Sequence, residues 1–342
     1  MFRRVVWSST IIDHRCGFTR VSLPVEVRFD PLTGRPCIIS EARLTLPVKA
    51  DFSELAKLTE AFCPFCPERI EAATPKFPEE FIPEGRIRVG EAVVVPNLMP
   101  YSQYSAVTII CKKHFATPSE LTQETLTNAF LASQEYLKKV ASHDPSQKHF
   151  LVTWNFMPPS GGSIIHPHLQ PVSYPEPTGY YHEQLDASRN FIARHGENFW
   201  ELLIKEEKKL GERYIGATGN IHWLTAFAPR NYLFEVIAVF LQKTSILELE
   251  HQDIENFAKG LTKILNYMEN VNITSFNLIL QSGPPNETSY RVNASIIPRF
   301  TLPPLGTSDT ASLRALNDTS VCYKKPETTC AEIKQYFQTT NG

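Results

Sequence analysis

Two histidines separated by a single proline are the residues of this sequence whose chemistry is most specific. The segment around them contains, in chain order, Gly161, Gly162, Ser163, His166, Pro167, His168 and Gln170. Alternate residues of an extended segment point to the same side, so His166 and His168 could face one site. Glycines let backbone amides approach an anion closely, and an amide side chain can donate to a phosphate oxygen. The segment suits covalent transfer of a phosphate-linked group by a histidine. Two solvated histidines on a surface loop would match the spacing equally well.

A pair of cysteines in Cys63-Pro64-Phe65-Cys66 is the second chemical feature. This spacing is used by thiolate ligands in zinc sites, and a tetrahedral site needs two further ligands, for which His114 and His166 are the candidates. A redox pair and two buried thiols are the alternatives, because the sequence has no second cysteine pair at this spacing.

The elements that must position these residues show both strand and helix patterns. Apolar runs at 25–29 and 37–40 flank the turn sequence 30–34, which predicts a hairpin. A proline-rich, irregular stretch is expected at 64–83. Further strands are predicted at 87–95, 106–111, 149–156, 223–227, 232–240, 276–281 and 292–297. Helices are predicted at 121–140, 189–210 and 251–269. The tail beyond residue 300 has no clear periodicity, and either packs over a site or forms loop.

The order of these elements is similar in the two halves of the chain. Each half has strands, one long helix and further strands, which predicts an α+β fold of two related units side by side. A length of 342 residues suits two domains or one double-sized fold. We expect the division at residues 1–175 and 176–342.

Composition excludes several classes of function. The formal net charge is -2, so nothing in the charge balance favours a nucleic acid polymer or a membrane surface. No apolar run has the roughly 20 residues of a spanning helix, and no signal peptide is recognised. We therefore expect a cytoplasmic protein. In that compartment the cysteine pair is better suited to a metal than to a disulfide.

Several separated segments resemble one family, galactose-1-phosphate uridylyltransferase and its relatives, which include nucleoside-diphosphate-sugar phosphorylases, within the histidine-triad superfamily. The similarity covers roughly residues 25–175 with specific motifs, and residues 200–300 in pattern only. The matching segments are 28–34, 40–43, 63–66, 96–100, 107–114, 120–121 and the run from Asn155 to Gln170.

The resemblance implies two histidine-triad-like halves, antiparallel sheets with flanking helices and a set of functional residues. It implies a nucleophile at His168 and a structural zinc ion bound by Cys63, Cys66, His114 and His166. It implies a substrate-binding set made of Arg43, Asn97, Asn155, Gly161, Gly162, Ser163 and Gln170. Of these, Asn155, Ser163 and Gln170 would hold phosphate oxygens, Arg43 would lie near the phosphates and Asn97 near the nucleoside.

The function expected from the residues and the resemblance together is ping-pong nucleotidyl transfer from a nucleotide-sugar donor to a phosphate-bearing acceptor. The acceptor would be a sugar 1-phosphate or inorganic phosphate. The alternatives are a histidine-triad hydrolase, a dinucleotide phosphorylase and a non-catalytic nucleotide sensor. The presence of His168 and Gln170 argues against the sensor. A homodimer is left open.

The second half departs from the family. The places of the family's further histidine cluster are taken by Gln281, Arg291 and Asn293, so no second metal site is expected. Leu169 stands where the family has a small residue. The family's sugar-phosphate segment is not recognisable in 301–330. The acceptor-phosphate candidates are Arg291, Arg299, Lys324 and Lys325. For each of them taken singly, solvated surface charge is the better explanation.

Overall fold

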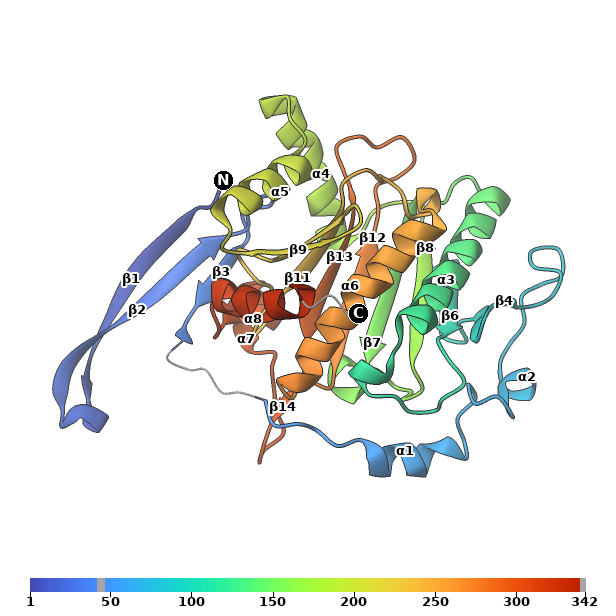
Figure 1. The fold of residues 1–342 in the computed structure, drawn as a ribbon, viewed down its shortest axis with the longest axis horizontal. Coiled ribbons are helices and arrows are strands. Elements are labelled where there is room, and N and C mark those ends of the chain that lie inside the picture. Colours follow the sequence, from blue (N-terminus) through green and yellow to red (C-terminus); the bar gives the residue numbers. More distant parts are fainter. Residues whose placement is uncertain (42–46, 339–342) are drawn as a thin grey trace.

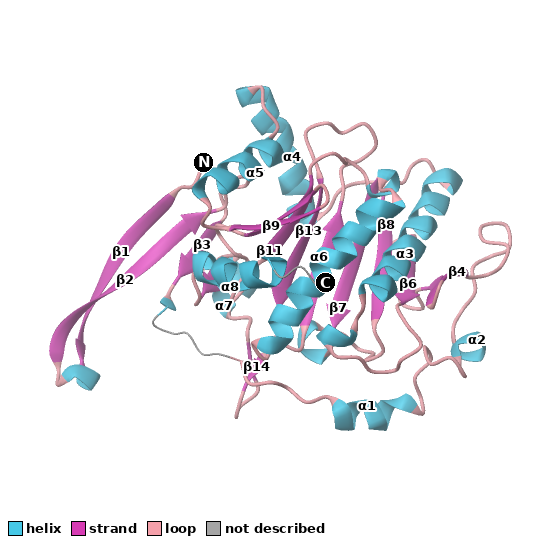
Figure 2. Cartoon of the chain, viewed as in Figure 1, coloured by secondary structure: helices cyan, strands magenta, loops and turns pink. Residues whose placement is uncertain are grey.

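A continuous ten-stranded sheet forms the centre of the protein in this computed structural model, which describes residues 1–41 and 47–338 (Figures 1 and 2). All neighbouring strands of the sheet are antiparallel. In spatial order they are β4 (Ile87–Val89), β5 (Ala92–Pro96), β6 (Tyr104–Ile109), β8 (His168–Tyr174), β7 (His149–Phe156), β12 (Phe276–Gln281), β13 (Val292–Pro298), β11 (Val236–Phe240), β10 (Ile221–Thr225) and β9 (Tyr214–Thr218).

The two halves of this sheet share one topology. In the first half the chain runs β5, β6, α3 (Gln123–His143), β7 and β8. In the second it runs β10, β11, α6 (His251–Asn270), β12 and β13. The spatial orders 5-6-8-7 and 10-11-13-12 correspond, and the halves join where β7 pairs with β12. The predicted α+β class with antiparallel strands and flanking helices is confirmed.

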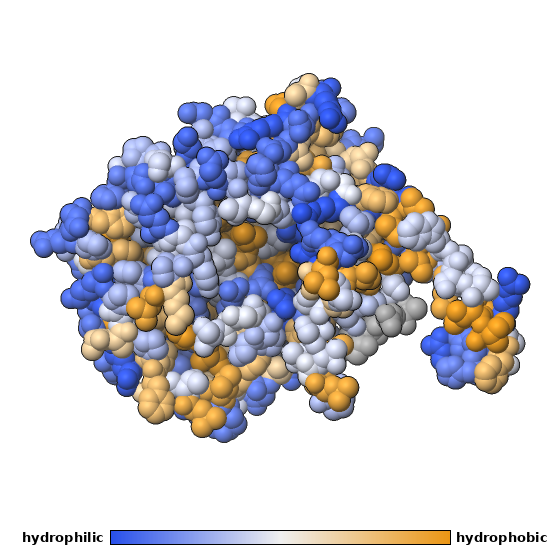
Figure 3. Space-filling view, turned by 180° about the vertical axis from the view of Figure 1, so that it is seen from behind, coloured by the Kyte–Doolittle hydropathy of each residue, from blue (hydrophilic) through white to orange (hydrophobic). Residues whose placement is uncertain are grey.

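The two faces of the sheet are covered by different layers. Val152 and Trp154 of β7 pack in the main core with α3, α6 and α8 (Pro326–Gln338), which lie together over one face in Figure 1. Leu151, the residue before Val152 in β7, packs in a separate cluster with α4 (Gly179–His195) and α5 (Phe199–Leu210) on the opposite face. This alternation follows from the two-residue period of a strand. The opposite face, seen in Figure 3, is hollowed near its centre.

The N-terminal segment forms a second sheet and a projecting hairpin. β1 (Arg4–Asp13) and β2 (Thr19–Phe29) extend from the body as a ribbon with apolar surface (Figures 1 and 3). β2 pairs with β3 (Pro36–Ile39) across the predicted turn, in which Asp30 Oδ1 accepts two backbone N–H groups. This sheet is completed by β16 (Ser320–Cys322), parallel to β3. The remaining elements are α1 (Ser53–Glu60), α2 (Ile70–Ala73), α7 (Ser312–Asn317), β14 (Thr301–Leu302), β15 (Thr307–Ser308) and the 3-10 turns η1 (His14–Cys16), η3 (Pro118–Glu120), η4 (Pro158–Ser160) and η5 (Ile246–Glu248).

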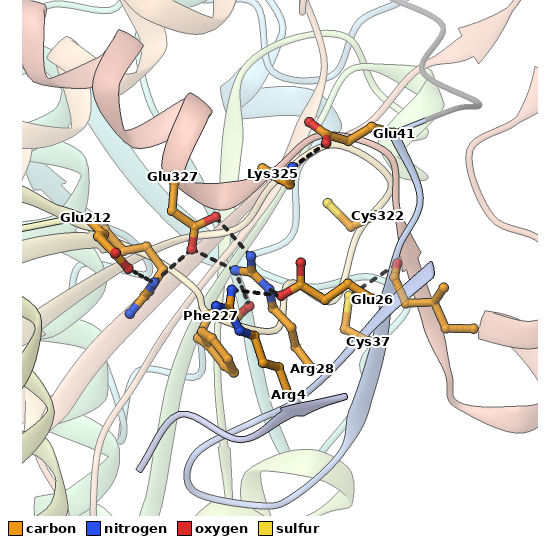
Figure 4. A network of polar contacts seen from close by, with 12 residues as sticks. Arg4, Glu26, Arg28, Cys37, Glu41, Glu212, Phe227, Cys322, Lys325 and Glu327 are labelled. Carbon is orange, nitrogen blue, oxygen red and sulfur yellow. Dashed lines mark hydrogen bonds and ion pairs between the residues drawn. The ribbon is translucent and has the colours of Figure 1, made fainter. Parts of the chain in front are cut away.

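A buried ion-pair network ties β2 to the C-terminal helix (Figure 4). Arg28 donates to both carboxylate oxygens of Glu327, at 2.8 and 3.0 Å, and Arg213 donates to Glu327 Oε1 at 2.8 Å. Both arginine side chains are at most 3% exposed. Burial alone would raise the pKa of Glu327, but the hydrogen bonds and charges of the two arginines outweigh it and lower this pKa to about 2. The network therefore depends on an ionised Glu327.

Two expectations about local structure were wrong. Residues 87–95 form two strands because Gly90, at a φ of +57°, turns the chain between them. Residues 189–210 belong to two helices because Gly196 ends α4 in the left-handed conformation and Asn198 caps α5. The tail, for which packing over a site and loop were both left open, contains α7, β16 and α8 in its described part, which extends to residue 338, and α8 packs on α6 and β9.

Among the helices in the described residues, none combines the length and apolar character needed to cross a bilayer.

Candidate active site

His168 opens β8, and its side chain is held by the backbone of its own motif. Its Nδ1 lies 2.8 Å from the carbonyl oxygen of His166. A carbonyl can only accept, so Nδ1 carries the proton and Nε2 presents a lone pair. Burial lowers the pKa of His168, and the bond to the carbonyl partly offsets that effect. The neutral ring is therefore oriented with a free nitrogen, which is the form that can attack an electrophile.

The four predicted metal ligands lie together. The ligand atoms of Cys63, Cys66, His114 and His166 are within 4.8 Å of one another, and all four residues are buried. The Nδ1 atoms of the histidines lie 3.4–3.8 Å from the cysteine sulfurs. A tetrahedral zinc ion with ordinary bond lengths would place such ligand pairs about 3.6 Å apart. The cluster could therefore hold a metal ion.

Both histidines of this cluster are oriented by their other ring nitrogen. His166 Nε2 lies 2.7 Å from the carbonyl oxygen of Cys111, and His114 Nε2 lies 3.1 Å from Thr59 Oγ1. With Nε2 protonated, Nδ1 of each ring faces the cysteines as an acceptor. His166 and His168 thus point to different sites although one residue separates them. The His166 ring faces Cys63 and Cys66, whereas the His168 ring presents its free Nε2 outside this cluster.

Asn155 and Gln170 lie on the same face of the sheet as His168. Thr153 of β7 pairs with Gln170 of β8, so Asn155 reaches the level of His168 two residues further along. Side chains of like parity on paired strands share a face. The described residues offer no hydrogen bond to the side-chain amide of Gln170 or to Asn155 Nδ2. Both amides can therefore donate to a ligand beside His168.

The glycine-rich loop joins η4 to His166. Gly161 has a φ of +89°, and a Cβ on Gly162 would lie 2.8 Å from the carbonyl oxygen of Asn155. The loop is therefore packed onto β7 in a way that only glycine allows. Ser163 is exposed beyond it. The loop therefore lies against the backbone of Asn155 and Met157.

The remaining predicted residues are distributed differently. Asn97 follows β5, and its side chain points to the same face of the sheet as those of Val93 and Val95, which pack with Cys63 and Phe65. It therefore lies on the face of His168, but β5 is two strands away from β8. Its side chain bonds Ser105 Oγ and the backbone N–H of Met99. Arg43 lies outside the described residues.

Among the four cationic candidates for an acceptor phosphate, Arg299 alone is linked to this site, through Asn277. Arg291 pairs with Glu201, Lys324 with Glu332 and Lys325 with Glu41.

The corresponding place in the second half is filled by an amide network. Gln281 Nε2 donates to Gln184 Oε1, to the Tyr290 hydroxyl and to Asn293 Oδ1. These side chains are buried and satisfy one another. Arg291 points away from them to α5.

Two contributors to the site were not predicted. Phe65, inside the cysteine pair, packs edge-on against His168 with ring centroids 5.3 Å apart, so the loop that carries Cys63 and Cys66 also contacts the His168 ring. Asn277 of β12 bonds Asn155 from the other half of the chain. The spacing of Phe65 within the motif could have indicated the first. No local pattern marks the second.

Solved structures place this architecture in one fold class. An ADP-glucose phosphorylase from Arabidopsis thaliana with bound ADP-glucose superposes with a TM-score of 0.72 at 18% identity, covering 93% of this chain and 99% of that one. A galt-like protein from Arabidopsis thaliana gives 0.70 at 18% identity, covering 90% and 98%. A uridylyltransferase gives 0.67 at 21% identity, covering 92% and 99%. The fold is therefore that of the galactose-1-phosphate uridylyltransferase-like proteins, as the resemblance predicted.

Sequence comparison gives a nearer relative. An uncharacterised protein from Archaeoglobus fulgidus is 34% identical over 317 residues, covering 92% of each chain. The chain belongs to one family with this archaeal protein. No family model matches the sequence.

Proposed function

We propose that the protein is a nucleotidyltransferase that acts on a nucleoside-diphosphate-sugar through a covalent nucleotidyl-His168 intermediate. The observation on which this rests is the 2.8 Å contact between His168 Nδ1 and the His166 carbonyl, which leaves Nε2 free. Asn155, Gln170 and the loop of Gly161, Gly162 and Ser163 are the proposed ligands of the phosphates. The similar folds include an ADP-glucose phosphorylase and a uridylyltransferase, which supports this class of reaction.

The reaction would proceed in two displacements. His168 Nε2 attacks the α-phosphorus, an N–P bond forms, and the bond from phosphorus to the bridging oxygen breaks, which releases a sugar 1-phosphate. An oxygen of the incoming phosphate then attacks the same phosphorus, and the N–P bond breaks. Nδ1–H stays bonded to the His166 carbonyl throughout and stabilises the positive ring of the adduct. Amide donors from Asn155, Gln170 and the glycine loop would stabilise the charge on the phosphoryl oxygens.

Zinc is the metal proposed for the cluster of Cys63, Cys66, His114 and His166. Two thiolates and two imidazoles form a donor set that zinc prefers, and four protein ligands leave no open position for substrate. Bound there, zinc would supply structural rigidity. His166 would then be anchored at its ring while its carbonyl orients His168, so the metal site would hold the nucleophile in place through one residue.

The acceptor is proposed as a phosphate-bearing molecule, either inorganic phosphate or a sugar 1-phosphate. Hydrolysis of the adduct and phosphorolysis of a dinucleotide are the competing functions. We further propose a division into halves at residues 1–175 and 176–342 and a cytoplasmic location. Monomer and homodimer are both compatible with the proposed reaction, and sedimentation velocity distinguishes them.

The experiment that tests the proposal is covalent labelling. Wild-type protein is incubated with ADP-, UDP- and GDP-glucose labelled at the α-phosphorus, then denatured and counted. One donor should leave close to one label per chain, and His168→Gly should leave none. His182→Gln is the matched control, because His182 is an exposed histidine of α4 and should not affect labelling.

A chase of the labelled protein distinguishes the competing functions. Inorganic phosphate or a sugar 1-phosphate should remove the label as a nucleoside diphosphate or a new nucleotide sugar. Release of free monophosphate in buffer alone at the same rate would assign a hydrolase instead. Absence of label with all donors, dinucleotides included, would refute the covalent mechanism.

A further inference from the structure

Arg299 and Asn277 form a chain of hydrogen bonds that ends on Asn155. Asn277 of β12 lies directly opposite Asn155 of β7, where the two halves of the sheet meet. Arg299 Nη1 donates to Asn277 Oδ1 at 2.8 Å, and Asn277 Nδ2 donates to Asn155 Oδ1 at 2.7 Å. Arg299 follows β13, and its backbone N–H bonds the Ser275 carbonyl. Two residues of the second half thereby control a side chain of the first.

The orientation of both amides follows from the chemistry of the chain's ends. A guanidinium has donors only, so Asn277 must present Oδ1 to Arg299. Asn277 Nδ2 also lies 2.9 Å from the carbonyl of Ser160, which can only accept. These two contacts agree, and they leave Asn155 Oδ1 as the acceptor of Asn277. Asn155 Nδ2, with both of its hydrogens, must then point away from Asn277.

The first member of the chain is itself held in place. Asp309 accepts from Arg299 Nε at 2.9 Å and from Nη2 at 3.0 Å, a bidentate contact, and the Asp309 side chain is 1% exposed. The charge of Arg299 is therefore balanced by Asp309. Nη1 of the same guanidinium donates to Asn277. The structure therefore gives Arg299 a contact to the site in addition to the acceptor-phosphate role expected from the sequence.

We propose that Arg299 and Asn277 are positioning residues that fix the side-chain amide of Asn155 with its NH2 group toward the phosphate of the donor. The same contact from Asn277 to the Ser160 carbonyl holds η4, from which the glycine loop continues. This inference rests on the proposed function only in placing a phosphate group beside Asn155. An amide rotated by half a turn would present oxygen to that phosphate, which replaces an attraction by a repulsion.

The test uses Asn277→Asp, which keeps the shape of the side chain and its bond from Arg299 but removes the donor. Asn155 would then rotate its NH2 group toward the new carboxylate. The dissociation constants of ADP and UDP are measured by calorimetry, because binding does not depend on the chemical step. Asn277→Asp should weaken the tighter of the two by about tenfold to a hundredfold, the range for a hydrogen bond to a charged group. Asn277→Leu, which lacks both donor and charge, should weaken it by a smaller factor.

A double-mutant cycle separates orientation from charge repulsion and from general damage. In an Asn155→Ala background, Asn277→Asp should change the dissociation constant by less than about threefold. The proposal is overturned if Asn277→Asp weakens binding equally in the wild-type and Asn155→Ala backgrounds, or if it does not weaken binding in the wild-type background. It is also overturned if the wild-type protein binds neither ADP nor UDP. Urea unfolding of each variant identifies any that fail to fold. Arg299→Lys, which keeps a charged donor, should retain more nucleotide affinity than Arg299→Met. Binding that behaves as predicted, together with absence of covalent label, would refute the proposed function and leave this inference intact.

Discussion

Replacing Glu327 by Gln should destabilise the protein by an amount that depends on pH. The pKa of Glu327 is about 2, against an ordinary value of 4.5. At about 1.4 kcal/mol per unit, the difference corresponds to about 3 kcal/mol of stability at neutral pH. Because the folded pKa lies below the unfolded one, this contribution is complete above about pH 5 and is lost as the pH falls from 4.5 through 2. About half should remain at pH 3.

Urea unfolding followed by tryptophan fluorescence at pH 7, 5 and 3 measures this difference. Glu212→Gln is the control, because Glu212 pairs with the same Arg213 but is 56% exposed, and it should cost at most about 1 kcal/mol at any pH. Equal losses for the two variants, or a loss for Glu327→Gln that is the same at pH 7 and pH 3, would refute the reasoning from the buried arginines.

Three further predictions concern the candidate site. Cys66→Ser should abolish stoichiometric metal in elemental analysis, whereas Cys111→Ser, a buried cysteine whose sulfur faces the Lys113 carbonyl, should retain it. A metal-free wild-type protein that is fully folded would contradict the cluster's role. Thr59→Val removes the partner of His114 Nε2 and should weaken metal affinity by about tenfold to a hundredfold in a competition titration with a chelator. Gly162→Ala places a Cβ 2.8 Å from the Asn155 carbonyl and should slow labelling of His168 by about a hundredfold. Unchanged labelling would show that the loop can shift without consequence.

Much of the candidate site was predictable because its residues are concentrated in short motifs. The spacing of His166 and His168 on an extended segment indicated a shared site. The structure refines this by giving the two rings different partners. The cysteine pair and its two histidines were predicted from ligand chemistry and resemblance, and their ligand atoms are adjacent. Local patterns sufficed wherever the functional residues lie near one another in the chain.

The chain of hydrogen bonds from Arg299 through Asn277 to Asn155 was not predictable, for a physical reason. Asn277 is 122 positions from Asn155, and only the register of β7 on β12 brings them together. That register is set by the packing of two whole halves, which no window of sequence contains. The sequence did not predict the projecting hairpin, in which β1 pairs mainly with β2. It did not predict α8 either, because this helix is stabilised by its contacts with α6 and β9 rather than by a strong apolar pattern of its own.

The network between Arg28 and Glu327 also has a consequence for how the chain is made. These residues are 299 positions apart, and β3 receives its parallel neighbour only from β16. A nascent chain stopped before residue 320 would contain every strand of the central sheet, so the sheet around His168 could assemble early. Arg28 would still have Glu26 but would lack Glu327, and β3 would lack β16. A buried guanidinium with incomplete charge compensation is unfavourable, so this region could not yet reach its final packing. β2 and β3 are synthesised before the central sheet but are expected to reach their final packing after it, once β16 and Glu327 are available.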